Sequence, residues 1–507
     1  MISLFRNSSF RWLRNGELRA GRSLLKILLL ICVVEACGIN SCSMVNLEND
    51  IGDNEHASFE KLLNNHPELD SVANIVYDSV SSHSDTNLYS QQLALFAEVF
   101  VLAQRKYINM LSPERLIAGA LSGVKKIQAN RMHGESKSPE IVMLTIIEHM
   151  ISNLDAHSAY LPPEVYEQAK ARRRGRFGGV GVQVKVENGL IRCIAAIEGA
   201  PAQRAGIEAG DRISHIDGEP VSGMNLRQAV ERMRGPPGST VLIRVLRGRD
   251  SQSFSFRIVR EVIHVESVRA RLEGDIGYVQ IHTFSEQTYR SMYDAINEFS
   301  SRQGHFLKGL VIDLRDNPGG LLDQALKVSD AFLAEGEIVS TIGRDNNQVR
   351  RFRANPQDIA FGIPIAILIN GGSASASEIV SGALKDHGRA IVLGERSFGK
   401  GSVQTVMPLG NGQGALRLTT ALYFTPSGKS IQVHGIEPDI VSENERSVSR
   451  ENNLDNYLSA QGPLPRSSGE LLQHACPHAA SVDDPILTCA FSTLRRRNVF
   501  HELDSYR

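Results

Sequence analysis

The sequence predicts a multidomain chain of α+β and α/β class, with a helical amino-terminal region, a small inserted β domain and an αβ core. Three observations lead to this prediction. Apolar residues repeat at helical spacing across 93–107, whereas residues 177–261 alternate short strand patterns with glycine turns. Further along, the apolar runs in 309–320 and 363–369 each lead into a glycine-rich turn followed by a helical pattern. That order is typical of strand–turn–helix units.

Ser375 is expected at one of these strand-to-helix junctions. Residues 363–369 predict a buried strand, Asn370-Gly371-Gly372 end it, and good helix formers follow from Ala376. Glu378 then falls in the first helical turn, where the helix dipole favours an anion. The Ser375 hydroxyl would lie near free backbone N–H groups, which can hold the oxyanion formed when a carbonyl is attacked.

Local pattern alone leaves this assignment open. A serine before a helix is more often simply an N-cap, and Ser373, Ser375 and Ser377 are alternatives for the nucleophile.

Lys400 is the candidate general base. It lies in the glycine-flanked loop 397–403, with aromatic and aliphatic neighbours and no acid within two positions. A free lysine has a pKa of about 10.4, so reaching about 7.5 by burial means roughly 4 kcal/mol of differential destabilisation. A solvated loop lysine is the alternative. With Gln404 to hold the lysine, the set predicts a hydrolase that cuts amide bonds by a Ser375/Lys400 pair without a histidine.

The turn Asn317-Pro318-Gly319-Gly320 follows the other predicted strand. Its glycines would expose backbone N–H donors as an anion-binding nest. A phosphate site is disfavoured because neither a G-x-x-x-x-G-K-[ST] nor a G-x-G-x-x-G pattern is present, and a plain tight turn is the simpler alternative. His387, at the end of the helix that follows Ser375, would lie roughly 18 Å from it at 1.5 Å rise per residue. It is therefore interpreted as a helix-terminal cation.

Taken together, the motifs at 313–320, 373–379, 394–401, Gln404 and 435–440 resemble the carboxyl-terminal processing peptidases, also called tail-specific proteases, which are Ser/Lys endopeptidases. The resemblance covers roughly residues 90–440 and implies a crotonase/ClpP-like αβ protease core. It implies the following roles: Ser375 as nucleophile, Lys400 as base, Gln404 as the residue that orients the lysine, and backbone N–H groups of Ala376, Gly319 and Gly320 as oxyanion donors. One departure is Ala156, where the family usually has proline, and it affects a structural turn.

Residues 177–261 resemble a PDZ domain, which adds a peptide as an extra strand and captures its terminal carboxylate. The resemblance implies that the carboxylate loop consists of Phe177, Gly178, Gly179, Val180 and Gly181. The helix that starts at Asn225 would form the side of the groove, and Arg234 is a candidate for docking the module against the protease body. A spacer domain is the alternative.

The amino terminus is expected to be a leader. Residues 1–22 carry five arginines and one acid, and an apolar run of about thirteen residues follows, which fits a secretory h-region better than a membrane span. Residues 1–37 are interpreted as a signal peptide or a lipoprotein leader with Cys37, and a retained short anchor is also possible. We expect an exported periplasmic protein. Association with the inner membrane is left open, and a plastid lumen is the alternative.

The expected organisation places a polar linker at 38–90, a helical region at 91–170, the PDZ domain at 177–261, the protease core at 265–440 and a tail at 441–507. A net charge of −1 gives no footprint for nucleic acid. Cys476 and Cys489 are candidates for a disulfide in an oxidising compartment, and no motif indicates a metal or another cofactor.

The expected function is therefore a serine endopeptidase that recognises the C-terminus of protein substrates through its PDZ domain and cleaves near it through an acyl-enzyme. Expected partners are proteins with a free C-terminus, a second copy of the chain, and an adaptor or activator protein. Two alternatives remain. One is an inactive PDZ scaffold that binds protein C-termini, and the other is an acyl-transferring enzyme of the crotonase type.

Overall fold

The computed structural model describes residues 58–80, 86–132, 138–187, 190–224, 226–248, 252–264, 266–303, 307–345, 349–442, 450–460, 470–476 and 482–496. The described residues belong to one compact unit, which spans Ala57–Arg507. The predictions for the leader, and for Cys37 in particular, lie outside the described residues. No helix in the described ranges is long and apolar enough to span a membrane.

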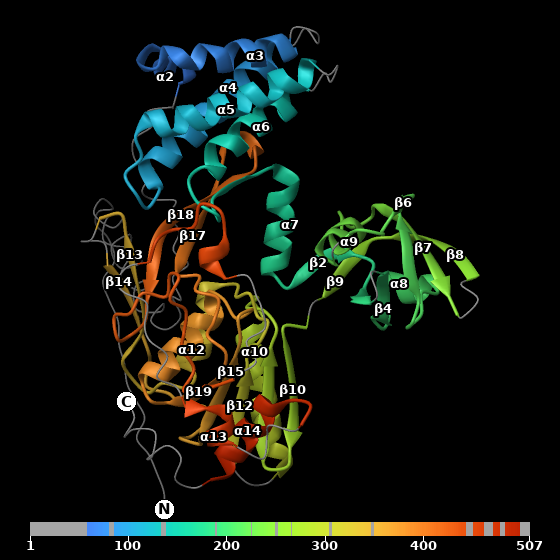
Figure 1. Cartoon of the computed structure of the whole chain (residues 1–507), viewed down its shortest axis with the longest axis vertical. Helices are drawn as coiled ribbons and strands as arrows, with labels where there is room; N and C mark the ends of the chain where they lie inside the picture. The colour runs from blue at the N-terminus through green and yellow to red at the C-terminus, as the bar shows by residue number, and fades with distance from the viewer. Residues whose placement is uncertain are drawn as a thin grey trace, which may run out of the picture. The chain divides into compact units, whose positions relative to one another are not determined.

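Five helices form the amino-terminal part of the described chain (Figure 1). They are α2 (Phe59–Asn65), α3 (Asp70–Val80), α4 (Thr86–Lys106), α5 (Pro113–Met132) and α6 (Pro139–Ser152). Their apolar faces share one core with Leu416 and Leu418 of a later strand. The polar linker expected at 38–90 is thus helical in much of its second half, because Leu69, Val72 and Val76 recur at helical spacing and are fully buried.

The part of the chain that resembles a PDZ domain is a six-stranded sheet beside a two-stranded one. The larger sheet has the order β3 (Val182–Glu187), β4 (Leu190–Ala196), β5 (Arg212–Ile216), β7 (Thr240–Arg247) and β8 (Gln252–Val259), and β6 (Glu219–Pro220) pairs with β5. The smaller sheet pairs β2 (Arg176–Gly179) with β9 (Glu261–His264). Two helices, α8 (Pro201–Ala205) and α9 (Leu226–Met233), complete the domain. The helix α7 (Pro163–Arg173) precedes it.

A seven-stranded sheet forms the centre of the predicted protease core. Its order is β10 (Val268–Glu273), β11 (Ile276–Ile281), β12 (Gly309–Asp313), β15 (Ile365–Ile369), β16 (Ala390–Gly394), β19 (Ile440–Val441) and β20 (Glu470–Leu471). From β11 onward neighbouring strands are parallel. Strands β12, β15 and β16 are buried along their whole length, as expected for a parallel sheet covered on both faces.

Helices cover both faces of this sheet. Alternate residues of β12 and β15 pack with α10 (Thr288–Gln303), α11 (Leu322–Asp330) and α12 (Ala376–Asp386) on one face. On the other face they pack with α14 (Pro485–Arg495) and with Cys476, which directly follows α13 (Leu472–Ala475). The predicted tail therefore contributes a strand and two helices to the core. Cys476 and Cys489 are joined by a disulfide, whereas Cys193 is free and buried.

The core contains a second sheet, which has five strands. It contains β1 (Ala159–Leu161), β18 (Ala415–Phe424), β13 (Glu337–Gly343) and β14 (Val349–Arg353), and β17 (Ser402–Pro408) pairs with β18. Short 3-10 helices lie at Pro67–Leu69, Gly410–Gly412 and Glu451–Asn453.

Candidate active site

Two neighbouring strands of the parallel sheet deliver the candidate nucleophile and its facing turn. Asp313 at the end of β12 pairs with Leu368 of β15, and Leu314 N–H donates to the Leu368 carbonyl at 2.9 Å. The loops that follow the two strands therefore begin side by side. In open parallel sheets, ligands bind beyond the carboxyl ends of the strands, so a catalytic or binding site is expected at this edge.

Ser375 occupies the last position before α12, in a conformation unusual for a residue with a side chain. Its φ of 55° and ψ of −109° lie outside the helical and extended regions. Of the three candidate serines, Ser373 and Ser377 are fully buried and donate to the carbonyls of Leu314 (2.8 Å) and Asn317 (3.0 Å). Ser375 is the partly exposed one. The geometry thus favours Ser375 among alternatives that the sequence pattern left open.

The glycine turn lies directly against Ser375. A Cβ atom added to Gly319 would be 2.9 Å from Ser375 Cβ and 3.0 Å from the Ala376 nitrogen, and Gly319 has a φ of 97°. Asn317 shapes the turn, because its Oδ1 accepts from Gly319 N–H at 2.9 Å and its Nδ2 donates to the Ile281 carbonyl at 2.7 Å. Gly319 N–H is therefore already paired. Among the described residues, the N–H groups of Gly320 and Ala376 donate to no acceptor.

Lys400 lies in the loop between β16 and β17. Burial lowers the pKa of Lys400 from its usual value, and the positive charge of Arg417 lowers it further. The carboxylates of Glu451, Glu378 and Asp155 act in the opposite direction. A lysine in this setting exchanges its proton at lower pH than an exposed lysine, as a general base requires.

A single buried carboxylate joins the segments of Ser375 and Lys400. Oε2 of Glu378 accepts from Ser375 N–H at 2.6 Å and from Lys400 N–H at 3.0 Å. Oε1 accepts from Ser397 Oγ at 2.6 Å and from Gly399 N–H at 2.7 Å. Burial raises the pKa of Glu378 to about 7, while the four donors act to lower it. The sequence pattern predicts Glu378 only as a partner of the helix dipole. Its place three residues after Ser375, the spacing of a capping box, was the signal for this role.

Gln404 lies on β17, close to this site. Its Nε2 donates to Ser402 Oγ at 2.9 Å and approaches Thr419 Oγ1 at 3.4 Å. Within the described part of the chain, no hydrogen bond joins Gln404 to Lys400 or Ser375 Oγ to Lys400 Nζ.

Asp155 organises the polar groups beyond Gln404. Its Oδ1 accepts from Thr419 Oγ1 at 3.0 Å and from His157 N–H at 2.8 Å, and its Oδ2 accepts from Ser158 Oγ at 2.6 Å. Asp155 directly precedes Ala156, the position at which the family usually has proline. The Ala156 N–H donates to the Asn456 carbonyl at 3.2 Å, a hydrogen bond that proline cannot make.

Glu451 reaches the site from beyond the expected end of the core. Its carboxylate is buried and contacts His157 Nε2 at 2.9 Å and Gln432 Nε2 at 2.9 Å. Gln432 Oε1 in turn accepts from Gly401 N–H at 3.0 Å, so this cluster supports the Lys400 loop from a second side. Nothing in the sequence pattern indicated Glu451.

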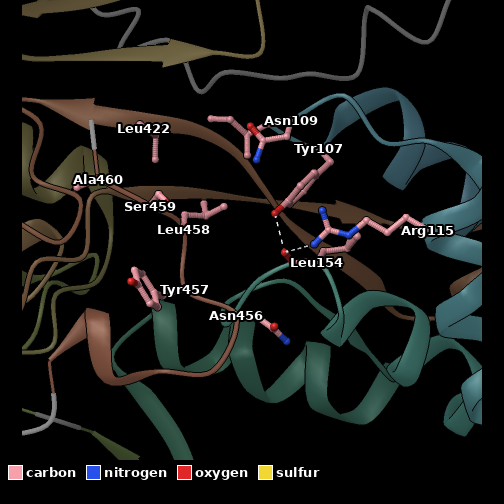
Figure 2. A pocket seen from close by; sticks show the side chains of 11 residues that line it. Tyr107, Asn109, Arg115, Leu154, Leu422, Asn456, Tyr457, Leu458, Ser459 and Ala460 are labelled. Carbon is pink, nitrogen blue, oxygen red and sulfur yellow. Dashed lines mark hydrogen bonds between the residues drawn. The ribbon is translucent and has the colours of Figure 1, made fainter. Parts of the chain in front are cut away.

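A pocket of about 440 Å³ lies near the segment that contains Glu451 (Figure 2). Residues 456–460 form one wall, and Tyr107, Arg115 and Leu154 form the opposite one. Tyr107 and Arg115 both donate to the Leu154 carbonyl, at 2.9 and 3.3 Å. The pocket contains none of the predicted catalytic residues.

The PDZ domain presents an open strand edge. β3 is the first strand of its sheet and pairs only with β4 among the described strands. The predicted carboxylate loop precedes it. The structure differs from the prediction for part of this segment, because Phe177, Gly178 and Gly179 lie on β2 and pair with β9, and only residues 180–181 form a loop before β3. The Gly178 carbonyl accepts from Gly235 N–H at 3.1 Å, and the guanidinium of Arg234 lies 4.5 Å from the Phe177 ring centre. Arg234 thus packs on β2 inside the domain, where its interaction is a cation–π contact.

No group of three or more possible metal ligands occurs among the described residues. The candidate site combines a partly exposed serine, a partly buried lysine, free backbone donors and supporting carboxylates, which fits a peptidase core joined to a peptide-binding domain.

Comparison with known proteins supports both parts. Residues 275–442 match the model of peptidase family S41, and residues 194–247 match that of the PDZ domain. The chain is 45% identical over 370 residues to a carboxy-terminal-processing protease of Bartonella bacilliformis, covering 73% of this chain and 79% of the relative. It is 35% identical over 307 residues to a carboxyl-terminal-processing protease of Synechocystis, covering 59% of this chain and 70% of the relative. A third relative is the carboxy-terminal processing protease CtpB of Bacillus subtilis, which is 32% identical over 349 residues, with 68% and 66% covered.

The chain belongs to the family of carboxy-terminal processing serine proteases, peptidase family S41, with a PDZ domain. It is a peptide hydrolase whose substrates are peptides or proteins. The family assignment gives no support to the inactive scaffold.

Proposed function

We propose that the protein cleaves peptide bonds with Ser375 as nucleophile and Lys400 as general base. One observation carries this proposal: the same oxygen of Glu378 accepts the backbone N–H groups of both residues. Two residues fixed to one buried atom stay close together while their side chains remain able to turn. Catalytic hydrogen bonds often tighten only when substrate binds, so a contact between Ser375 Oγ and Lys400 Nζ is expected to form at that stage.

In the proposed reaction, Ser375 Oγ bonds to the carbonyl carbon of the substrate and its proton passes to Lys400 Nζ. The resulting oxyanion accepts from the N–H groups of Gly320 and Ala376, which have no other acceptor among the described residues. The C–N bond then breaks, and the departing amine takes the proton from Lys400. Water then attacks the acyl carbon and gives a proton to the neutral lysine. The bond between that carbon and Ser375 Oγ breaks, and Lys400 returns the proton to Oγ, which restores the free enzyme.

The PDZ domain supplies the substrate's C-terminus to this site. The open edge of β3 fits strand addition. Residues 177–181, of which 180–181 lie between β2 and β3, are proposed to capture the terminal carboxylate. Gln404 is proposed to orient Lys400 through the polar groups around Thr419. We further propose export to the periplasm through the leader, association with the inner membrane, self-association of the chain, and control by an adaptor protein.

The test uses the chain from Ala57 onward, which is a compact unit by itself. It is incubated with an unfolded reporter that ends in apolar residues, and product masses are read by mass spectrometry. Parallel samples contain Ser375→Ala, Lys400→Ala, and Lys385→Ala as a matched lysine control on α12. Cleavage by the parent and the Lys385 variant, but by neither of the other two, is expected. Equal cleavage by the Ser375 or Lys400 variant would refute the assignment, and tail binding without any cleavage would favour the scaffold.

A further inference from the structure

The outer face of the PDZ sheet carries an unusual set of side chains. Residues of alternate parity point to opposite faces of a strand. In β7, Val241, Ile243 and Val245 are fully buried in the core of the domain, so Arg244 points to the outer face. The strand register then identifies the other residues on that face.

Three cations lie directly opposite one another at one end of this face. Lys185 of β3 pairs with Arg192 of β4, and Arg192 pairs with Arg212 of β5. Like charges at opposed positions in a sheet destabilise it. Glu187 offsets part of this repulsion, since it forms ion pairs with Lys185 at 2.9 Å and Arg192 at 2.5 Å. It is the one acid that the described strands place on this face.

Two further cations extend the set across the sheet. Arg244 of β7 lies two residues from Leu246, the partner of Arg212, and Arg257 of β8 is the partner of Leu242. Both arginines are exposed, and neither forms an ion pair with a described residue. We call Lys185, Arg192, Arg212, Arg244 and Arg257 the basic face.

Exposed aliphatic side chains accompany the basic face. Ile194 on β4 is 49% exposed and Val259 on β8 is 51% exposed, and the register places both on the outer side. Positive charge is also in excess in this domain. Residues 177–261 contain twelve Lys and Arg and nine Asp and Glu, whereas the whole chain has a net charge of −1. Cations spread over a sheet face can attract anionic headgroups, and the exposed aliphatic side chains can enter the boundary below them. A folded acidic protein would instead need carboxylates at positions that match each cation, so a lipid surface is the better fit.

We propose that the basic face binds the anionic headgroups of a phospholipid bilayer. The guanidinium groups contact lipid phosphates, and Ile194 and Val259 enter the boundary between headgroups and acyl chains. The basic face includes Lys185 of β3, but it uses side chains that point away from the sheet, whereas strand addition uses backbone groups along the edge of β3. The domain can therefore hold a peptide and a bilayer at the same time. The inference is independent of the proposed catalytic residues.

The test uses the chain from Ala57 onward with the leader absent, so that only the folded part can bind. Sedimentation is measured with vesicles of phosphatidylcholine alone and of phosphatidylcholine with phosphatidylglycerol. The test variant is Arg244→Gln with Arg257→Gln. The matched control is Arg204→Gln with Arg350→Gln, which removes the same charge from exposed positions off this face. Cleavage of a soluble reporter is followed for every variant.

We expect binding to the anionic vesicles only, with a loss as salt is raised. At about 1 kcal/mol for each cation, the test variant loses affinity roughly 25-fold, and the control variant keeps it. Arg244→Lys with Arg257→Lys retains binding, which separates charge from folding, and soluble cleavage stays unchanged throughout. Equal loss in the control, or no preference for phosphatidylglycerol, would overturn the proposal. Binding to polyglutamate without binding to vesicles would overturn it in favour of an acidic protein partner.

Discussion

The Glu378 carboxylate couples the two proposed catalytic residues at the scale of single atoms. Each oxygen accepts two hydrogen bonds, one pair from Ser375 and Lys400 and the other from Ser397 and Gly399. An amide in place of the carboxylate keeps its volume but must turn an NH₂ group toward two donors. A buried donor without an acceptor costs about 1–3 kcal/mol.

We therefore predict that Glu378→Gln lowers kcat/KM by roughly tenfold to hundredfold, the range that corresponds to that penalty. The effect falls mainly on kcat, because the PDZ domain and substrate contacts are untouched. Asp323→Asn on the exposed surface of α11 serves as the control and leaves both constants unchanged. Full activity in the Glu378 variant would contradict the coupling.

Gly319 gives a second prediction at this scale. Gly319→Ala places a methyl group 2.9 Å from Ser375 Cβ and also strains a backbone with φ of 97°. Gly218→Ala is the matched control, because Gly218 has a similar φ of 85° but open space around it. Both variants lose about 1 kcal/mol or more of stability from backbone strain, measured by denaturant unfolding. We expect only Gly319→Ala to lose cleavage activity, and equal activity in both would show that the contact is unimportant.

At the scale of elements, β18 and the segment around Glu451 place opposite charges near Lys400. Arg417 lowers the pKa of Lys400 and Glu451 raises it. In the proposed mechanism activity requires the neutral lysine, so the acid limb of the kcat/KM profile is expected to follow that pKa.

Two charge-removing variants should shift that limb in opposite directions. Arg417→Gln removes a positive charge, raises the pKa of Lys400 and moves the limb to higher pH. Glu451→Gln removes a negative charge and moves the limb to lower pH. Profiles of kcat/KM against pH measure both shifts, with Arg350→Gln as a control that leaves the limb in place. A shift of both variants in one direction would rule out a direct charge effect.

The elements also show what the sequence could predict. The helix expected from Ala376 begins at that residue, and the strand expected at 363–369 is found at Ile365–Ile369, because apolar runs and glycine turns are local signals. Glu378 had a local signal that was interpreted too narrowly. Glu451 had none, since it pairs with His157 across 294 positions and only the tertiary fold brings them together.

At the scale of the whole molecule, the last part of the chain stabilises the core. α14 packs on β12 and β15, the strands that lead to the turn at Gly319 and to Ser375. The disulfide between Cys476 and Cys489 ties this helix to the preceding segment.

We predict that Cys476→Ser with Cys489→Ser lowers the free energy of unfolding by about 2–4 kcal/mol. Adding a reductant should lower the Tm of the parent to that of the double variant, and it should leave the Tm of the double variant unchanged. Cys193→Ser, at the free buried cysteine, serves as the control and remains sensitive to reductant. If the double variant had the same Tm as the parent without reductant, α14 would be shown to dock without the crosslink.

The Glu378 carboxylate, shared by Ser375 and Lys400, also limits how the two loops that it joins can vary in length. One side chain accepts hydrogen bonds from the backbone of both loops and so fixes the distance between them. Neither loop can therefore gain or lose a residue without displacing the backbone donor of the other. Insertions between 370 and 378 or between 396 and 401 should therefore be among the least tolerated in the chain, even though both stretches are loops for most of their length. The usual freedom of loops to vary in length is withdrawn here, and the two segments must change together or remain as they are.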